Sequence, residues 1–378
     1  MSAYFAEMSK ALLAADIHRP CLVLDRDRLD ANIALVKQRL TPGLAVRLVD
    51  KSLPCVPLLS YIAKALDTNR FMTFHPPVTQ AVLDAFPEGD LLYGKPMPVG
   101  AAKAALTRGG AGWWSRVCWL IDTPERLAEY GALAAELSTE LRFAFEVDVG
   151  LHRGGLASPS EIKALTIPKG LRCEGIMAYE AHAPEIPGVF GGAAKALEKA
   201  STLAAAFVAA LEPDQRRILN IGGSKTALLH GGGTANEVSM GSAFVLPSDF
   251  DKPGLDGFQP AAFIATPILK VAAAALPGPA WLSKTLQALG LFPRKGCYLY
   301  GGKWMADPVF PEGMKPNGLM GFSSNQQFMG LPATAHVKPG DYAFLRPTQS
   351  EAVLQHFGAI AVLSGGRIVE FWPVLPMG

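Results

Sequence analysis

Short apolar runs alternate with helical stretches between residues 44 and 245, and this alternation limits the possible folds more than any other feature. The eight predicted strands lie at 45–49, 70–74, 90–93, 116–121, 142–148, 173–179, 218–221 and 238–245. The helical stretches between them lie at 58–65, 77–86, 99–108, 124–137, 159–164 and 193–211. Eight strands separated by helices predict a (β/α)8 TIM-like barrel rather than an open doubly wound sheet. No G-x-G-x-x-G motif follows the first strand, which also argues against a dinucleotide-binding fold.

The character of the chain changes after about residue 250, where proline and glycine become frequent. Short apolar runs follow at 262–271, 297–300, 342–345, 359–363 and 368–372. The stretch Ser364-Gly365-Gly366-Arg367 predicts a hairpin turn between the last two runs. A further strand is predicted at 21–24, with a helix at 27–40 capped by Asp25 or Asp27. We therefore expect a barrel over 20–250 and a C-terminal β-rich domain formed by 1–19 and 251–378, with a helical insertion near 277–293.

Composition excludes several classes of protein. Hydrophobic residues make up 49% of the 378 residues and charged residues 18%, so the chain can form a large core. The net charge is +2 without a basic block, so nucleic acid is not an expected partner. No apolar stretch is long enough to cross a membrane, and the first ten residues lack a signal-peptide pattern. Five widely spaced cysteines suit reduced thiols in the cytoplasm better than disulfides or a zinc site.

One lysine, Lys51, directly follows the first strand of the predicted barrel. The carboxyl ends of barrel strands are where such folds keep their chemistry. In an apolar environment a lysine loses its proton readily, and a neutral amine can form a Schiff base with an aldehyde. The alternative is an ordinary surface lysine, which Lys51 alone does not exclude.

Four other strand ends carry residues with chemical potential. The fifth strand leads into a glycine-rich turn with His152 and Arg153, where a guanidinium can donate to an anionic oxygen. Asn220-Ile221-Gly222-Gly223-Ser224-Lys225-Thr226 follows the seventh strand, the region where barrels bind phosphate, although it is not a Walker A motif. Tyr179-Glu180-Ala181-His182 follows the sixth strand, and Glu237 with Met240-Gly241-Ser242-Ala243 marks the eighth. Each of these is also compatible with an ordinary polar loop.

Taken in order, these motifs resemble the fold-type III pyridoxal-phosphate enzymes of the alanine racemase superfamily. The pattern D-x-G-x-x-R-x-G is present as Asp148 to Gly155. Within the superfamily the chain is most similar to the D-threonine aldolase and D-serine dehydratase group. The opening Arg19-Pro20-Cys21-Leu22-Val23-Leu24-Asp25 is similar to that group's T-P-x-L-V-L-D start. The closing Trp372-Pro373-Val374 resembles its W-P-V ending, so the likeness spans about residues 19–375.

The resemblance implies roles for particular residues. Lys51 would hold pyridoxal 5'-phosphate as an internal aldimine and act as a base on one face of the substrate. Arg153 would contact the phenolic oxygen of the cofactor, and Tyr179 would line its ring. The phosphate would be held by Gly222, Gly223, Ser224, Gly241 and Ser242. Further acid-base candidates are His152, His182 and His75. The active site in this superfamily commonly lies at a dimer interface, which implies a homodimer.

The chain departs from the group at its metal site. The group's P-N-H-x-[CD] motif is replaced by Pro347-Thr348-Gln349-Ser350-Glu351, and its E-H-G signature by Gln326-Gln327-Phe328. Both imidazole ligands are therefore missing, and imidazoles are strong ligands for zinc or manganese. Glu351 remains a weak candidate ligand for a divalent metal. Since the group's metal activates the substrate's β-hydroxyl, a metal-free reaction is the alternative.

Three functions follow from the resemblance. The first is a lyase of the D-threonine aldolase type, which cleaves or dehydrates a β-hydroxy D-amino acid, with D-serine dehydratase-type ammonia release as a variant. The second is a metal-independent amino-acid racemase or epimerase, which needs a second base opposite Lys51. The third is a non-catalytic pyridoxal-phosphate carrier, which the β-rich domain argues against because such carriers are typically the barrel alone.

Overall fold

The computed structural model describes residues 2–231, 233–351 and 353–376. The chain forms two compact units. One consists of residues 33–244 with 250–258 and the residues after 374, and the other of residues up to 32, 245–249 and 259–374.

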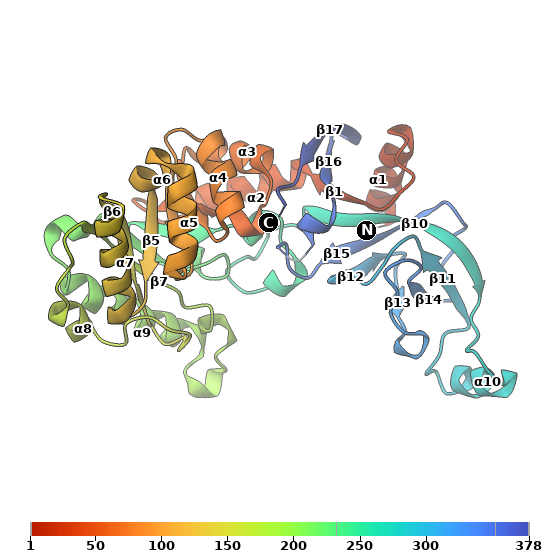
Figure 1. The fold of residues 1–378 in the computed structure, drawn as a ribbon. Helices are drawn as coiled ribbons and strands as arrows, with labels where there is room; N and C mark the ends of the chain where they lie inside the picture. Colours follow the sequence, from red (N-terminus) through yellow and green to blue (C-terminus); the bar gives the residue numbers. More distant parts are fainter. Residues whose placement is uncertain (1, 232, 352, 377–378) are drawn as a thin grey trace. The chain divides into compact units, whose positions relative to one another are not determined.

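The first of these units is a closed barrel of eight parallel strands (Figure 1). The strands are β2 (Ala45–Val49), β3 (Arg70–Thr73), β4 (Asp90–Tyr93), β5 (Val117–Ile121), β6 (Leu141–Val147), β7 (Leu171–Ala178), β8 (Ile218–Ile221) and β9 (Glu237–Met240). The barrel closes where β9 pairs with β2, with Ala45 opposite Glu237 and Leu48 opposite Met240. The predicted (β/α)8 barrel is therefore confirmed, and all eight predicted strands form it. They are recognisable because strands buried on both faces appear in the sequence as nearly continuous apolar runs.

Helices follow most of the strands and cover the outside of the barrel (Figure 1). They are α3 (Val56–Leu66), α4 (Pro76–Ala85), α5 (Val99–Gly109), α6 (Ala111–Arg116), α7 (Pro124–Glu136), α8 (Pro159–Ala164) and α9 (Gly192–Ala209). Thr123 caps α7 by accepting a hydrogen bond from the Arg126 N–H at 3.1 Å. Helix α6 was not predicted, because it has only six residues and begins next to two glycines. Between β8 and β9 the described residues form no α-helix but only a single helical turn, η5 (Ala227–Leu229).

A buried ion network fills the amino-terminal end of the barrel. The Arg47 side chain is fully buried and donates to Glu237 at 2.5 and 2.9 Å and to Asp90 at 2.7 Å. Arg142 also donates to Asp90, at 2.7 Å. Burial alone would raise the pKa of Asp90, but the two guanidinium groups outweigh this effect and lower it. This end of the barrel is thus closed by paired charges, and its carboxyl-terminal end carries the loops with the candidate site.

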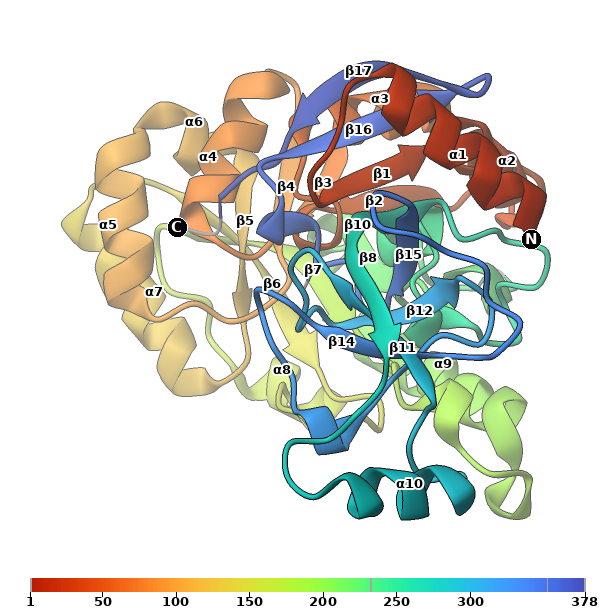
Figure 2. The same cartoon turned by 90° about the vertical axis from the view of Figure 1, so that its right-hand side faces the viewer.

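The other unit is built on a nine-stranded mixed sheet, as the prediction of a β-rich domain required. Its strands are β1 (Cys21–Asp25), β10 (Ala262–Ala273), β11 (Lys295–Leu299), β12 (Ala306–Phe310), β13 (Lys315–Pro316), β14 (Phe328–Leu331), β15 (Tyr342–Pro347), β16 (Ala359–Ser364) and β17 (Arg367–Pro373). Strand β1 pairs antiparallel with β10 and parallel with β16, which lies beside it in Figure 2. The eight-stranded barrel is closed and has no edge that β1 could join. The expected boundary at residue 20 would assign this strand to the barrel unit, whereas its hydrogen bonds join the strand-rich sheet.

The strand-rich unit also contains α1 (Ser2–Ala14), α10 (Ala280–Ala288) and the start of α2 (Arg26–Arg39). Asp25 caps α2 by accepting from the Arg28 N–H at 3.1 Å. Helix α10 lies within the segment where a helical insertion was expected. The predicted hairpin turn between β16 and β17 is confirmed, and Gly365 and Gly366 have φ angles of +54° and +74°. Strands β12, β13 and β14 were not predicted, because prolines and glycines interrupt their apolar pattern.

Two further expectations concern the described residues as a whole. None of their helices is long and apolar enough to cross a membrane. All five cysteines are buried free thiols, as expected.

Candidate active site

Lys51 lies at the carboxyl-terminal end of β2, in the single-turn helix η1 (Asp50–Ser52). Its side chain is half-buried, and Nζ lies 4.7 Å from the centroid of the Phe74 ring, which follows β3. A cation held over an aromatic face is partly shielded from solvent. Lys51 therefore differs from an ordinary surface lysine, the alternative that the sequence left open.

Two glycines allow the late loops to approach the residues around Lys51. A Cβ at Gly241 would lie 2.8 Å from Cβ of Ser52 and 3.0 Å from Cβ of Val49. A Cβ at Gly223 would lie 2.6 Å from Cε2 of Tyr179. Cβ atoms in proteins essentially never lie closer than 3.0 Å to a neighbour, so a side chain at either position would require its neighbours to shift. The segments after β8 and β9 therefore lie directly against Tyr179 and the neighbours of Lys51.

Ser224 joins the two late loops to each other. Its Oγ accepts hydrogen bonds from the N–H of Gly241 at 3.0 Å and of Ala243 at 3.2 Å. Ser242 lies between these two residues and is buried. The residues of the two loops that we predict to bind phosphate thus lie next to one another, although they are separated by about twenty positions in the sequence.

Arg153 connects the loop after β6 with Tyr179. Its guanidinium carbon lies 5.2 Å from the centroid of the Tyr179 ring, and a guanidinium nitrogen lies 3.5 Å from Oε1 of Glu146. Burial raises the pKa of Glu146, and the charge of Arg153 opposes this rise. A planar cation beside an aromatic ring can donate to an oxygen of a ligand that lies along that ring.

The three candidate histidines have different environments. His152 is 83% exposed, and its Nδ1 lies 2.7 Å from Asp148 Oδ2. His182 has a buried Nδ1 without a hydrogen-bond partner among the described residues, and its Nε2 lies next to Gly150. His75 precedes α4, and its pKa is lowered by burial and by the charges of Lys95 and Lys51. His75 is therefore within electrostatic reach of Lys51.

Sequence reasoning assigned no role to Asp50, the residue before Lys51. Its side chain is fully buried, and neither carboxylate oxygen has a hydrogen-bond partner of normal geometry among the described residues. Burial raises the pKa of this carboxyl to about 7, although the Thr73 hydroxyl, the Lys51 N–H and the Lys51 charge act to lower it. A carboxyl group that titrates near neutral pH beside a candidate nucleophile is typical of functional sites. Its burial has no signal in the sequence, since aspartate at a strand end normally faces solvent.

Glu351 lies in the strand-rich unit, in the turn after β15. Its Oε2 accepts a hydrogen bond of 3.4 Å from Ser350 Oγ, and the nearby Gln349 donates to Asp249 at 3.0 Å. The residues that the structure describes contain no group of three or more histidine, cysteine, aspartate or glutamate side chains arranged to hold a metal ion. Glu351 as a metal ligand therefore stays a prediction.

Comparisons with known proteins identify the family and the fold of the chain. Residues 24–249 match the family model of the alanine racemase N-terminal domain. D-threonine aldolase from Filomicrobium marinum is 16% identical with a TM-score of 0.73, and the match covers 95% of this chain and 97% of that chain. D-threo-3-hydroxyaspartate dehydratase from Delftia sp. HT23 is 16% identical with a TM-score of 0.72, over 94% of this chain and 97% of that chain. Alanine racemase from Bacillus anthracis is 15% identical with a TM-score of 0.70, over 94% of this chain and 98% of that chain. The comparison with curated proteins finds no match.

At such low identities the structural likeness establishes the fold, whereas the family match covers more than half of the chain. The resemblance inferred from the sequence motifs is confirmed. The chain belongs to the alanine racemase N-terminal domain family, the fold-type III group of pyridoxal-phosphate enzymes.

Proposed function

We propose that the chain is a pyridoxal-phosphate enzyme that acts on a β-hydroxy D-amino acid, as a lyase of the D-threonine aldolase type. The observation that carries the proposal is the convergence of Lys51, Tyr179 and the two glycine-containing loops at one end of the barrel. The likeness to D-threonine aldolase and D-threo-3-hydroxyaspartate dehydratase supports the substrate class, since both names specify a D-amino acid with a β-hydroxyl group.

The residues present fit the three parts of this cofactor. Lys51 offers an amine to its aldehyde from a position over Phe74. The ring of Tyr179, with Arg153 beside it, offers an apolar face and a cation for the pyridine ring and its phenolic oxygen. The loops at Gly223 and Gly241 pack closely around this site, and in the loop after β8 the backbone N–H groups of Ser224 and Lys225 are available to a phosphate.

When bound, pyridoxal phosphate supplies an electron sink for the electrons left at the substrate Cα. Retro-aldol cleavage then needs a base that removes the proton of the β-hydroxyl and an acid that returns a proton to Cα after the Cα–Cβ bond breaks. We propose that Nζ of Lys51 is the acid that returns the proton to Cα. We assign the hydroxyl proton to His182, whose Nδ1 has no hydrogen-bond partner among the described residues. His152 is the weaker candidate, because Asp148 holds its ring at an exposed position.

A second candidate function is racemisation or epimerisation without a metal. The favouring observation is His75, at the start of the helix after β3, whose pKa is lowered by burial and by the charges of Lys95 and Lys51, so that its neutral, basic form is favoured. Racemisation needs a second base that removes or returns the Cα proton on the face opposite Lys51. A pure cofactor carrier is less well supported, because the chain also contains the nine-stranded unit.

The first experiment is an absorbance scan of the purified protein with pyridoxal phosphate, followed by additions of D- and L-amino acids. We expect a cofactor band that borohydride fixes at Lys51 and that is absent from a folded Lys51→Ala variant. D-threonine should shift the band and release glycine and an aldehyde, whereas dehydration would release a keto acid and ammonia. Solvent deuterium at Cα of both enantiomers without cleavage would identify a racemase. A protein that binds the cofactor and shows no shift with any amino acid would be a carrier.

The remaining expectations complete the proposal. Metal analysis of the same sample tests whether Glu351 belongs to a divalent-cation site. We propose a homodimer, which light scattering of the purified protein tests. We also propose a cytoplasmic protein, which the five free buried thiols support and which fractionation of cells would test.

A further inference from the structure

Glu180 follows Tyr179 directly and is fully buried, yet it has no part in the chemistry described above. Its Oε2 accepts a hydrogen bond from the Gly222 N–H at 3.2 Å. Its Oε1 accepts from the Thr226 hydroxyl at 2.5 Å and faces Nε2 of His230 at 3.0 Å. An ionised carboxylate only accepts hydrogen bonds, so His230 carries a proton on Nε2 in this arrangement.

These three partners belong to one short segment. Gly222 begins the glycine turn (residues 222–226), Thr226 ends it, and His230 lies four residues beyond it. Thr226 also accepts a hydrogen bond from the Gly223 N–H at 3.1 Å. The first two amides of the turn are therefore occupied by Glu180 and by its partner Thr226. The next two, those of Ser224 and Lys225, have no hydrogen-bond partner in the part of the chain that the structure describes. Glu180 thus fixes one side of the turn and leaves the following amides available to an anion.

A carboxylate near a phosphate site is electrostatically unfavourable, because the two negative charges repel each other. Burial of a carboxylate is also costly unless donors satisfy both oxygens. Here both oxygens are satisfied, and two of the three donors belong to the glycine turn itself. The arrangement is explained if Glu180 serves to hold the shape of the turn and its negative charge is not what the site requires.

We propose that Glu180, together with His230, is the positioning residue of the phosphate-binding turn and sets the preference of the protein for phosphorylated over unphosphorylated pyridoxal. This inference rests on the proposed function, in which the turn binds the cofactor's phosphate. Glu180 acts through the backbone of residues 222–226 and touches neither cofactor nor substrate.

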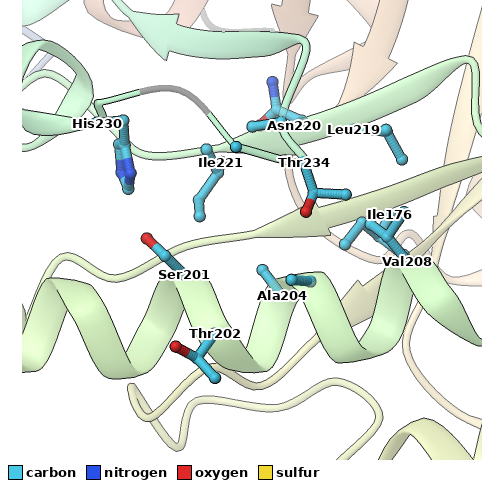
Figure 3. A pocket seen from close by; sticks show the side chains of 13 residues that line it. Ile176, Ser201, Thr202, Ala204, Val208, Leu219, Asn220, Ile221, His230 and Thr234 are labelled. Atoms are coloured by element: carbon cyan, nitrogen blue, oxygen red, sulfur yellow. The ribbon is translucent and has the colours of Figure 1, made fainter.

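The His230 side chain is buried, with 5% of its surface exposed. It lines a hollow of about 270 Å³ between α9 and β8, where Figure 3 shows its ring opposite Ser201 of α9. Removal of the imidazole in His230→Ala would extend this hollow to the Glu180 carboxylate. Free imidazole is small enough to enter such a space and to replace the missing donor.

The test compares equilibrium binding of pyridoxal phosphate and pyridoxal, which share the aldehyde and ring and differ in the phosphate. The wild type should bind the phosphorylated form more tightly. Glu180→Gln keeps the volume of the side chain, but its NH₂ group cannot accept a hydrogen bond and so faces at least one of the three donors without pairing. We expect it to weaken pyridoxal-phosphate binding about 10- to 100-fold, the loss typical of a hydrogen bond to a charged group, and to leave pyridoxal binding within about twofold of wild type. His230→Ala should lose about tenfold for pyridoxal phosphate and regain it with added imidazole.

Glu174→Gln is the matched control, because Glu174 is another fully buried carboxylate, lies within β7 and accepts a hydrogen bond from Arg142 at the opposite end of the barrel. It should lower the unfolding temperature without changing the preference for the phosphorylated form. The inference is overturned if folded Glu180→Gln keeps the wild-type preference, or if it weakens both ligands equally as a merely structural residue would. A wild type that binds neither ligand through Lys51 would instead refute the proposed function.

Discussion

Asp50→Asn should remove a large pH dependence from the stability of the barrel. The Asp50 carboxyl is fully buried, and its pKa rises from 3.8 to about 7 because burial disfavours the charged form. An unfolded chain ionises this group near pH 3.8, so the folded state binds the extra proton between the two values. A raised carboxyl pKa therefore lowers the stability progressively as pH rises from about 4 to 7 and leaves the full loss above pH 7.

The size of the effect follows from the interval between the two pKa values. Roughly three pH units at about 1.4 kcal/mol each give a loss of about 4 kcal/mol for the wild type above pH 7 relative to acid pH. Asparagine has nearly the same volume and does not titrate. The free energy of unfolding of Asp50→Asn minus that of wild type should therefore be about 4 kcal/mol larger at pH 8 than at pH 4, because only the wild type loses stability over this range. A constant contribution from the buried amide cancels in this difference.

Urea unfolding of both proteins without cofactor at several pH values measures this quantity. A difference between the two proteins that stays constant from pH 4 to pH 8 would refute the reasoning. Lys51→Met provides a second check, because the Lys51 charge lowers the pKa of Asp50. Without that charge the pKa of Asp50 should rise further. The loss of stability with rising pH should then continue to higher pH in Lys51→Met than in wild type.

Three shorter predictions test other parts of the barrel. Arg47→Met removes a guanidinium group that pairs with the buried Glu237 and should lower the free energy of unfolding, measured by urea titration, by about 3–5 kcal/mol. Arg172→Met is the control, because the Arg172 side chain is 42% exposed, and it should lower that free energy by about 1 kcal/mol or less. Gly223→Ala places a methyl group against Tyr179 and should weaken pyridoxal-phosphate binding at least tenfold in a spectroscopic titration. Gly100→Ala, where a methyl group would meet no atom within 4 Å, should leave that affinity unchanged. His75→Gln should slow solvent deuterium exchange at Cα of only one enantiomer if His75 is the second base, as mass spectrometry would detect.

The barrel could be predicted from the sequence because each strand is both short and apolar. Lys51, Arg153, Tyr179 and Ser224 each follow a strand, and the carboxyl ends of parallel strands in a closed barrel meet at one end. Their convergence was therefore predictable without knowledge of any distance. The pairing of strand β1 with β10 and β16 could not be predicted in this way, because its apolar run resembles those of the barrel strands and only hydrogen bonding distinguishes them.

The contacts of buried polar residues could not be predicted in this way. Glu180 and His230 are separated by fifty positions, and no local pattern indicates that they meet. Asp50 precedes a lysine, which in a sequence suggests a solvated pair rather than a buried acid. Side-chain burial at strand ends depends on how the neighbouring loops pack, and that packing is specific to the folded chain.

Three buried carboxylates of the barrel differ in how they are compensated. Glu237 is paired with guanidinium groups at the amino-terminal end, and Glu180 is satisfied by three donors behind the glycine turn. Asp50 alone among the three lacks a hydrogen-bond partner of normal geometry within the described residues, and it directly precedes Lys51. A purely structural carboxylate would be expected to acquire partners, because an uncompensated buried acid destabilises the fold. The buried acid is therefore better explained as a group that exchanges a proton beside the Lys51 amine, and the pH dependence of Asp50→Asn tests whether it titrates near pH 7 as that role requires.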